Sequence, residues 1–165
     1  MINLKNNPVG VDKPIQEIAQ ELYDSLGYSS MEGYGRVDLI ERKGKTIPCH
    51  FLDGIDYKEI VLKKSDVTYF FLENNKTEVL NRLQSKSNFD VVFLINLKKA
   101  EPNITHRADE EVRVKISNIL SNYSKEMLKS TTRGGDAIDF DSNLVDMQPY
   151  HFIKFSCELV YNINC

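Results

Sequence analysis

Acidic and basic side chains gather between residues 53 and 64, at Asp53, Asp56, Glu59, Lys63 and Lys64. Two carboxylates can hold a divalent cation and a lysine can steady a phosphate, which are the parts of a metal-dependent phosphodiesterase. On an extended strand, however, Glu59 and Lys63 are four residues apart, or about 13 Å. The spacing favours a charged hairpin face, and a metal-dependent nuclease or other hydrolase using the 53–64 region stays as an alternative prediction.

Residues 139 to 150 begin like a calcium-binding loop, with Asp139, Asp141 and Asn143 at alternate positions. Such a loop needs glycine at its sixth position for the sharp turn and glutamate at its twelfth to hold the cation with both oxygens. This sequence has Leu144 and Tyr150 there. The pattern therefore predicts a solvated acidic loop without a calcium site.

The three histidines, His50, His106 and His151, are far apart in the sequence. His50 follows Cys49, and neighbouring residues of a strand point to opposite faces, so these two side chains cannot form a catalytic pair. The sequence has no His-Glu-x-x-His, Cys-x-x-Cys, Gly-x-Ser-x-Gly or Walker-type glycine motif. We therefore predict that the protein is not an enzyme, with no catalytic, cofactor-binding or metal-binding residue and no cofactor.

The composition is typical of a soluble globular domain. The 165 residues are 41% hydrophobic and carry a net charge of −3, which fits one domain over residues 1–165. The longest apolar runs are far shorter than the ~20 residues that span a bilayer. The first residues lack the apolar segment of a secretory signal, so we expect folding in the cytosol and no membrane contact. Because charges of both signs are interspersed, a dedicated nucleic-acid binder is disfavoured.

The three cysteines have no paired spacing, which predicts neither a disulfide framework nor a zinc finger. Cys49 and Cys157 stand within strand-like patterns and are expected to be small buried residues. Cys165 is expected to be a free thiol.

Two segments have helical periodicity. Between Pro14 and Leu26, apolar residues recur at relative positions 0, 3, 4, 7, 8 and 11 from Ile15, and Gly27 suits the left-handed residue that ends a helix. In residues 107–123 apolar residues recur at relative positions 0, 4, 7, 8 and 11 from Val112, after three acidic residues that the helix dipole favours in a first turn. Both segments are predicted to be amphipathic helices.

Alternating or continuous apolar patterns predict the strands. Residues 35–41 and 46–52 indicate a hairpin with positive φ at Gly44, and Pro48 favours an edge or a protrusion for its second arm. Asn75 and Glu78 resemble a capping box for a short helix. The remaining predicted strands are residues 57–62, 66–72, 89–97 and 150–163.

These elements predict an α+β fold, with a single mostly antiparallel β-sheet, two main helices packed on one face and a protruding hairpin. Residues 89–97 are almost continuously apolar, which suits a central strand. Residues 153–163 alternate from Ile153 to Ile163, so this last strand must be docked, next to 89–97. Residues 1–13 form a polar lead, and residues 124–149 are predicted to be a long flexible loop.

The layout resembles the tail-terminator and tail-completion proteins of tailed bacteriophages, which form rings at the neck between head and tail. The resemblance is carried by the helix beginning Pro14-Ile15-Gln16-Glu17-Ile18 and by the aromatic alternating strand over residues 149–161. It implies a homo-oligomeric ring, a hexamer or dodecamer, with a channel for DNA as transiting cargo.

The resemblance further implies that the partners are neighbouring phage neck and tail proteins. The protein would be located in the virion, at the neck or tail, after assembly in the host cytoplasm. Residues 41–54 would form a projecting arm. Besides the hydrolase, a small adaptor domain that binds a protein partner through its sheet edge stays as an alternative.

Overall fold

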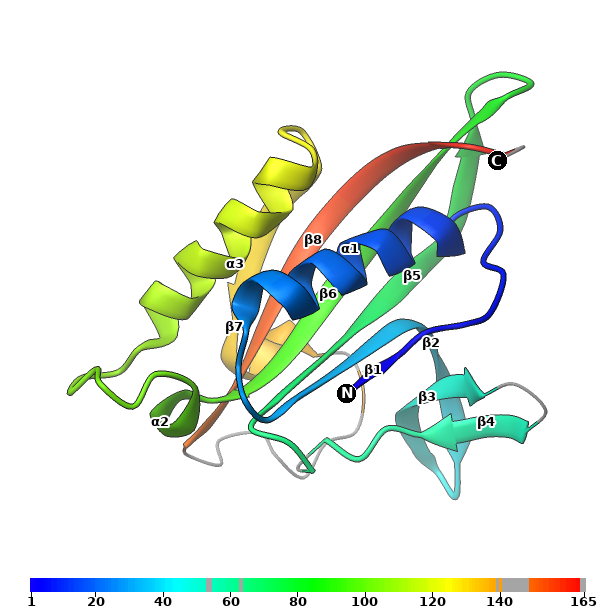
Figure 1. Cartoon of the computed structure of the whole chain (residues 1–165). Helices are drawn as coiled ribbons and strands as arrows, with labels where there is room; N and C mark the ends of the chain where they lie inside the picture. Colours follow the sequence, from blue (N-terminus) through cyan, green and yellow to red (C-terminus); the bar gives the residue numbers. More distant parts are fainter. Residues whose placement is uncertain (53–54, 63, 139, 141–148, 164–165) are drawn as a thin grey trace.

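The computed structural model describes residues 1–52, 55–62, 64–138, 140 and 149–163. They form an α+β fold with a mixed, mostly antiparallel sheet (Figure 1). The strands are β1 (Ile2–Asn3), β2 (Met31–Arg42), β3 (Lys45–Leu52), β4 (Ile55–Glu59), β5 (Val67–Val79), β6 (Gln84–Asn96), β7 (Leu128–Arg133) and β8 (Tyr150–Asn162). The helices are α1 (Asp12–Leu26), α2 (Leu97–Ala100), α3 (Asp109–Tyr123) and the 3₁₀ turn η1 (Gly134–Ala137).

The strands follow the order β4-β3-β2-β5-β6-β8-β7, and β1 adds to β2. Only the β1–β2 and β2–β5 pairs are parallel among the described strands. The predicted class, α+β with one mostly antiparallel sheet, is therefore confirmed.

The central position of β6 is confirmed, because β5 and β8 pair with its two sides. β8 docks beside β6 in unbroken register from Gln84↔Asn162 to Asn96↔Tyr150, as expected from its alternation. Its alternate residues from Ile153 to Leu159 are buried, but Ile163 is 40% exposed. Tyr161 is half-buried as well, so the expectation that all six alternating residues are buried is wrong at the last two.

The sheet is packed on both faces. On one face α1 and α3 lie side by side (Figure 1), and their apolar residues share a core cluster with Tyr69, Phe93 and Phe155 of the strands. On the other face a second cluster joins Phe70 and Val92 to Ala137 of η1 and its neighbours. The helix prediction over residues 14–26 is confirmed, and Gly27 ends α1 with φ +62°.

β2 and β3 form the predicted hairpin. Lys43 and Gly44 have φ values of +53° and +72°, and Arg42 pairs with Lys45 across them, which is the geometry of a two-residue type I′ turn. The placement of Pro48 at an edge is wrong, because β4 pairs with the other side of β3. The Pro48 carbonyl accepts a hydrogen bond from the Ile60 N–H at 3.0 Å.

Two further predictions are wrong, and a third is displaced along the chain. The short helix after Asn75 is absent, because β5 runs on to Val79 and pairs with β6 at Thr77↔Ser87 and Val79↔Ser85. Residues 124–149 are not wholly a loop, since β7 pairs with β8 and η1 follows it. The predicted strand over 57–62 is shorter and earlier, at Ile55–Glu59.

Candidate functional site

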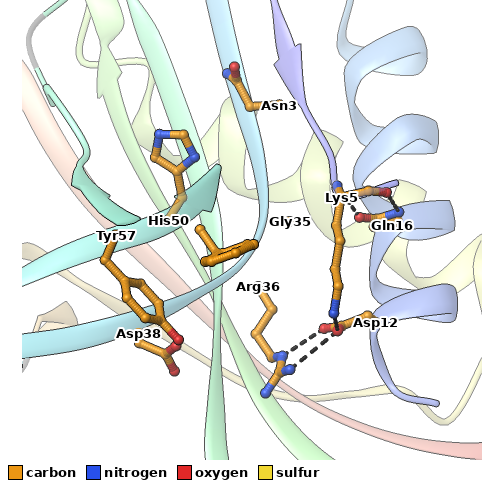
Figure 2. Close-up of a pocket in the computed structure, with 10 residues that line it drawn as sticks. Asn3, Lys5, Asp12, Gln16, Gly35, Arg36, Asp38, His50 and Tyr57 are labelled. Carbon is orange, nitrogen blue, oxygen red and sulfur yellow. Dashed lines mark hydrogen bonds and ion pairs between the residues drawn. The ribbon is translucent and has the colours of Figure 1, made fainter. Parts of the chain in front are cut away.

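A polar hollow of about 160 Å³ lies where the N-terminal segment, α1, β2 and β3 meet (Figure 2). Its position follows from β2, whose first half pairs with β5 and whose second half turns aside to pair with β3. The space left beside the bend is closed by residues 1–5 and the start of α1. The lining residues are Asn3, Lys5, Asp12, Gln16, Gly35, Arg36, Asp38, His50, Phe51 and Tyr57.

One wall of the hollow is an ionic cluster. Asp12 accepts hydrogen bonds from Arg36 Nε at 2.7 Å and from Lys5 Nζ at 3.0 Å (Figure 2). The Arg36 guanidinium also donates to Glu73 Oε2 at 3.0 Å. Burial by itself would raise the pKa of Asp12, but the bonds from Arg36 and Lys5 outweigh it and lower the pKa. Both cations of this wall are therefore already neutralised by carboxylates.

The opposite wall comes from β2, β3 and β4. The His50 ring is buried and lies 4.9 Å, centroid to centroid, from that of Tyr34. Burial, and then the charge of Lys58, lower the pKa of His50, so the imidazole is neutral near pH 7. Phe51 is 51% exposed and meets Tyr57 edge to face at 5.8 Å.

Asp38 lines the hollow on the side of Tyr57 (Figure 2). Its side chain is exposed, and no Lys, Arg or His nitrogen of the described residues lies within 4 Å of its carboxylate. The lining of the hollow thus includes both an unpaired carboxylate and an exposed aromatic ring. That combination suits a guanidinium or ammonium group, which binds carboxylates and also stacks on aromatic faces.

Sequence reasoning did not single out Asp12, Arg36 or Asp38. A local signal exists for only two of them, because residues two apart on a strand point to the same face, which places Arg36 and Asp38 together. Asp12 lies in the hollow because of the way α1 crosses the sheet, and no local sequence pattern predicts that crossing.

The structure does not assemble the predicted alternative site of the 53–64 region. Lys64 forms an ion pair with Glu32 at 2.7 Å, and Glu59 is an exposed residue opposite Cys49. Asp53, Lys63 and the side chain of Asp56 lie outside the described residues. In the described part of the chain, no group of three or more His, Cys, Asp or Glu side chains is placed to hold a metal ion.

The histidines fall into two places. His50 lines the hollow described above, whereas His106 and His151 line a second hollow of about 380 Å³ before α3. There His106 binds Glu111 at 2.7 Å, and Arg107 contacts the His151 ring at 3.3 Å. The calcium-like segment, at 139 and 141–144, lies outside the described residues.

Cys49 and Cys157 are buried within β3 and β8, as predicted, and Cys165 lies outside the described residues. None of the helices described has the length and apolar character needed to cross a membrane. We found no family model, curated protein or solved structure that matches this chain.

Proposed function

We propose that this protein is a non-enzymatic structural component of a tailed-phage virion. In this proposal it forms a homo-oligomeric ring at the neck or tail end, with a central channel through which DNA passes. The layout of helices and strands that suggested this family supports the proposal only as a resemblance. The observation that carries it is the distribution of apolar side chains on the surface.

Five large apolar residues are exposed near the end of β5, the start of β6 and the end of β8, and we call them the hairpin-end patch. They are Val79, Leu80, Leu83, Val160 and Ile163, with exposed fractions between 40% and 70%. Two of them are joined directly through the backbone, since the Ile163 N–H donates to the Leu83 carbonyl at 2.8 Å. Apolar residues gathered in this way indicate a surface that is covered in the assembled state.

A second group is exposed on and after the β2–β4 strands, at Leu39, Phe51 and Val61. It lies far from the end of the β5–β6 hairpin (Figure 1). Two different surfaces on one chain suit a head-to-tail contact, in which one surface of each copy meets the other surface of the next. Contacts of this kind close into rings when the rotation between copies permits.

The charge balance is compatible with a channel that DNA passes through without being held. The net charge is −3, and many charged side chains of the described residues pair with one another on the surface. A protein that grips DNA instead neutralises several phosphates with clustered Lys and Arg. In the proposed ring, the β2–β3 hairpin is the projecting arm that reaches a neighbour.

The test is the mass and shape of the purified full chain. Light scattering and native mass spectrometry should give one closed oligomer, and negative-stain images should show rings with a central hole. A strict monomer at millimolar concentration would overturn the proposal. A monomer that cleaves DNA with Mg²⁺, and loses this activity in Glu59→Ala, would establish the hydrolase alternative in its place.

A further inference from the structure

The β5–β6 hairpin ends in a turn that is held rigidly. The Asn81 side-chain oxygen accepts the N–H groups of Leu83 at 2.9 Å and Gln84 at 3.0 Å. Its amide nitrogen donates to the Gln84 side-chain oxygen at 3.0 Å. Since Gln84 also accepts the N–H groups of Leu80 and Asn81 through its carbonyl, the turn loses little further freedom when it binds.

Arg82 stands at the centre of this turn. Its side chain is exposed, and no carboxylate of the described residues lies within 4 Å of its guanidinium. Leu80 and Leu83 flank it and are 45% and 59% exposed. The turn therefore presents an unpaired cation between two apolar side chains.

The hollow beside β2 is complementary in charge and in apolar character. Asp38 is an unpaired carboxylate of its lining, and exposed Phe51 lines the same hollow. Lys5 and Arg36 do not compete for Asp38 through a direct ion pair, because Asp12 and Glu73 bind them. A volume of about 160 Å³ is below the ~300–1,000 Å³ of small-molecule sites and suits the end of one side chain.

The two features cannot meet within one chain. Asp38 follows Val37, which pairs with Leu72 of β5, and from Leu72 the hairpin runs eight residues on to Leu80. At ~3.3 Å per residue this places the turn about 26 Å beyond Leu72, outside the reach of an arginine side chain. Figure 1 shows the end of the hairpin well away from β3.

We propose that Arg82 of one copy enters the hollow of the next copy and pairs with Asp38, with Leu80 and Leu83 covering Phe51. This inference rests on the proposed ring and says which two surfaces meet between neighbouring copies. Because the two halves of the contact are different surfaces, each copy uses its turn toward one neighbour and its hollow toward the other. A closed ring then satisfies every Arg82 and every Asp38.

Charge reversal tests the pair. Arg82→Glu and Asp38→Arg should each weaken association at least about 100-fold, because each leaves two like charges facing one another in a covered contact. Lys125→Glu makes the charge change of Arg82→Glu on an exposed residue between α3 and β7, outside the hollow and the β5–β6 turn, and should leave the oligomer intact. Circular dichroism and urea unfolding should show that all three variants remain folded, since the substituted side chains are exposed.

Mixing the two single variants gives the sharper result. The turn of the Arg82→Glu variant then carries a carboxylate that fits the guanidinium in the hollow of the Asp38→Arg variant. The unchanged turn of the second variant likewise fits the unchanged hollow of the first, so the mixture should form a ring of alternating copies that neither variant forms alone. The double variant Arg82→Glu/Asp38→Arg should assemble by itself. Native mass spectrometry with one variant isotopically labelled would show whether each ring holds equal numbers of the two variants, as alternation requires.

The outcomes separate this inference from the ring itself. If the natural chain is a monomer, the ring and its contact both fail. If the natural chain is a ring and Arg82→Glu assembles as well as Lys125→Glu, the contact is wrong and the ring stands. Single variants that fail to assemble and are not restored by mixing would likewise overturn the pairing of Arg82 with Asp38.

Discussion

Replacing Asp12 by Asn should destabilise the fold by about 2–3 kcal/mol. The carboxylate is 9% exposed and accepts three hydrogen bonds, two from Arg36 and one from Lys5. Breaking a fully buried ion pair costs roughly 3–5 kcal/mol. Since the side chains of Arg36 and Lys5 are 36% and 43% exposed, water replaces part of what they lose, and the lower figure applies.

Urea unfolding followed by circular dichroism would measure the difference. Asp24→Asn is the matched control, because Asp24 is an exposed carboxylate of the same helix, and it should change stability by less than about 0.5 kcal/mol. Arg36→Gln should cost a similar amount to Asp12→Asn, and the double variant should cost less than the two singles added together.

The difference between the natural chain and Asp12→Asn should also depend on pH. The pKa of Asp12 in the folded state is below its ordinary value of 3.8, so the folded form binds the proton less readily than the unfolded chain does. The contribution of Asp12 to stability is therefore complete above about pH 5. It is lost as the pH falls below 3.8 and through the pKa of Asp12 in the folded state. A difference under about 0.5 kcal/mol at pH 7, or one that grows toward acid, would refute the reasoning.

Two further predictions concern buried side chains. Gly33→Ala should lower the free energy of unfolding in urea by about 1–3 kcal/mol, because the added Cβ would lie 2.3 Å from the Tyr69 hydroxyl oxygen. Gly35→Ala should be tolerated, because the atom nearest to its Cβ would be 3.6 Å away. Equal effects of the two substitutions would contradict this. The Cys157 thiol is 3% exposed and burial raises its pKa from 9.0 to about 12, so a given pH leaves on the order of 1,000-fold less thiolate than in the unfolded chain. Peptide mapping after alkylation should find Cys157 labelled in urea and protected in the native protein, and equal labelling would show that the strand opens readily.

Patterns that report burial on a regular element predicted the main frame of the fold. Ile15, Ile18 and Leu22 recur at helical spacing because one side of α1 faces the sheet, and all three are almost fully buried. The continuous apolar run in β6 reflects burial on both faces. In both cases the spacing of the apolar side chains follows from which faces are buried, so the sequence alone predicts the element.

The errors arose where pairing of the backbone decides the structure. Val79, Leu80 and Leu83 have a helix-like spacing after Asn75 and Glu78, yet their side chains are exposed, so no apolar face favours a helix. Pairing with β6 satisfies the backbone of β5 up to Val79, and this tertiary contact overrides the local capping pattern. β7 was missed for the same reason, because it is an edge strand with little buried apolar surface.

The hollow could not be predicted, because its residues come from the N-terminal segment, α1, β2, β3 and β4. Asp38 and Phe51 line the same hollow because β2 changes partner from β5 to β3 part-way along its length. Neither residue belongs to a motif. Asp38 can bind a cation from outside only if other carboxylates neutralise Lys5 and Arg36. Asp12 of α1 pairs with both, and this contact depends on the tertiary structure.

The place of β8 has a consequence for biosynthesis. β8 lies between β6 and β7 in the sheet but is made after both, so a nascent chain holds β6 with one side unpaired until residues 150–162 have left the ribosome. In that interval Phe93 lacks its edge-to-face partner Phe155. The same open side can accept β8 from a second chain whose own β8 has been made but has not yet docked, so rapid expression should favour strand-exchanged dimers. Such dimers would separate only on unfolding, whereas copies joined through exposed surfaces separate on dilution.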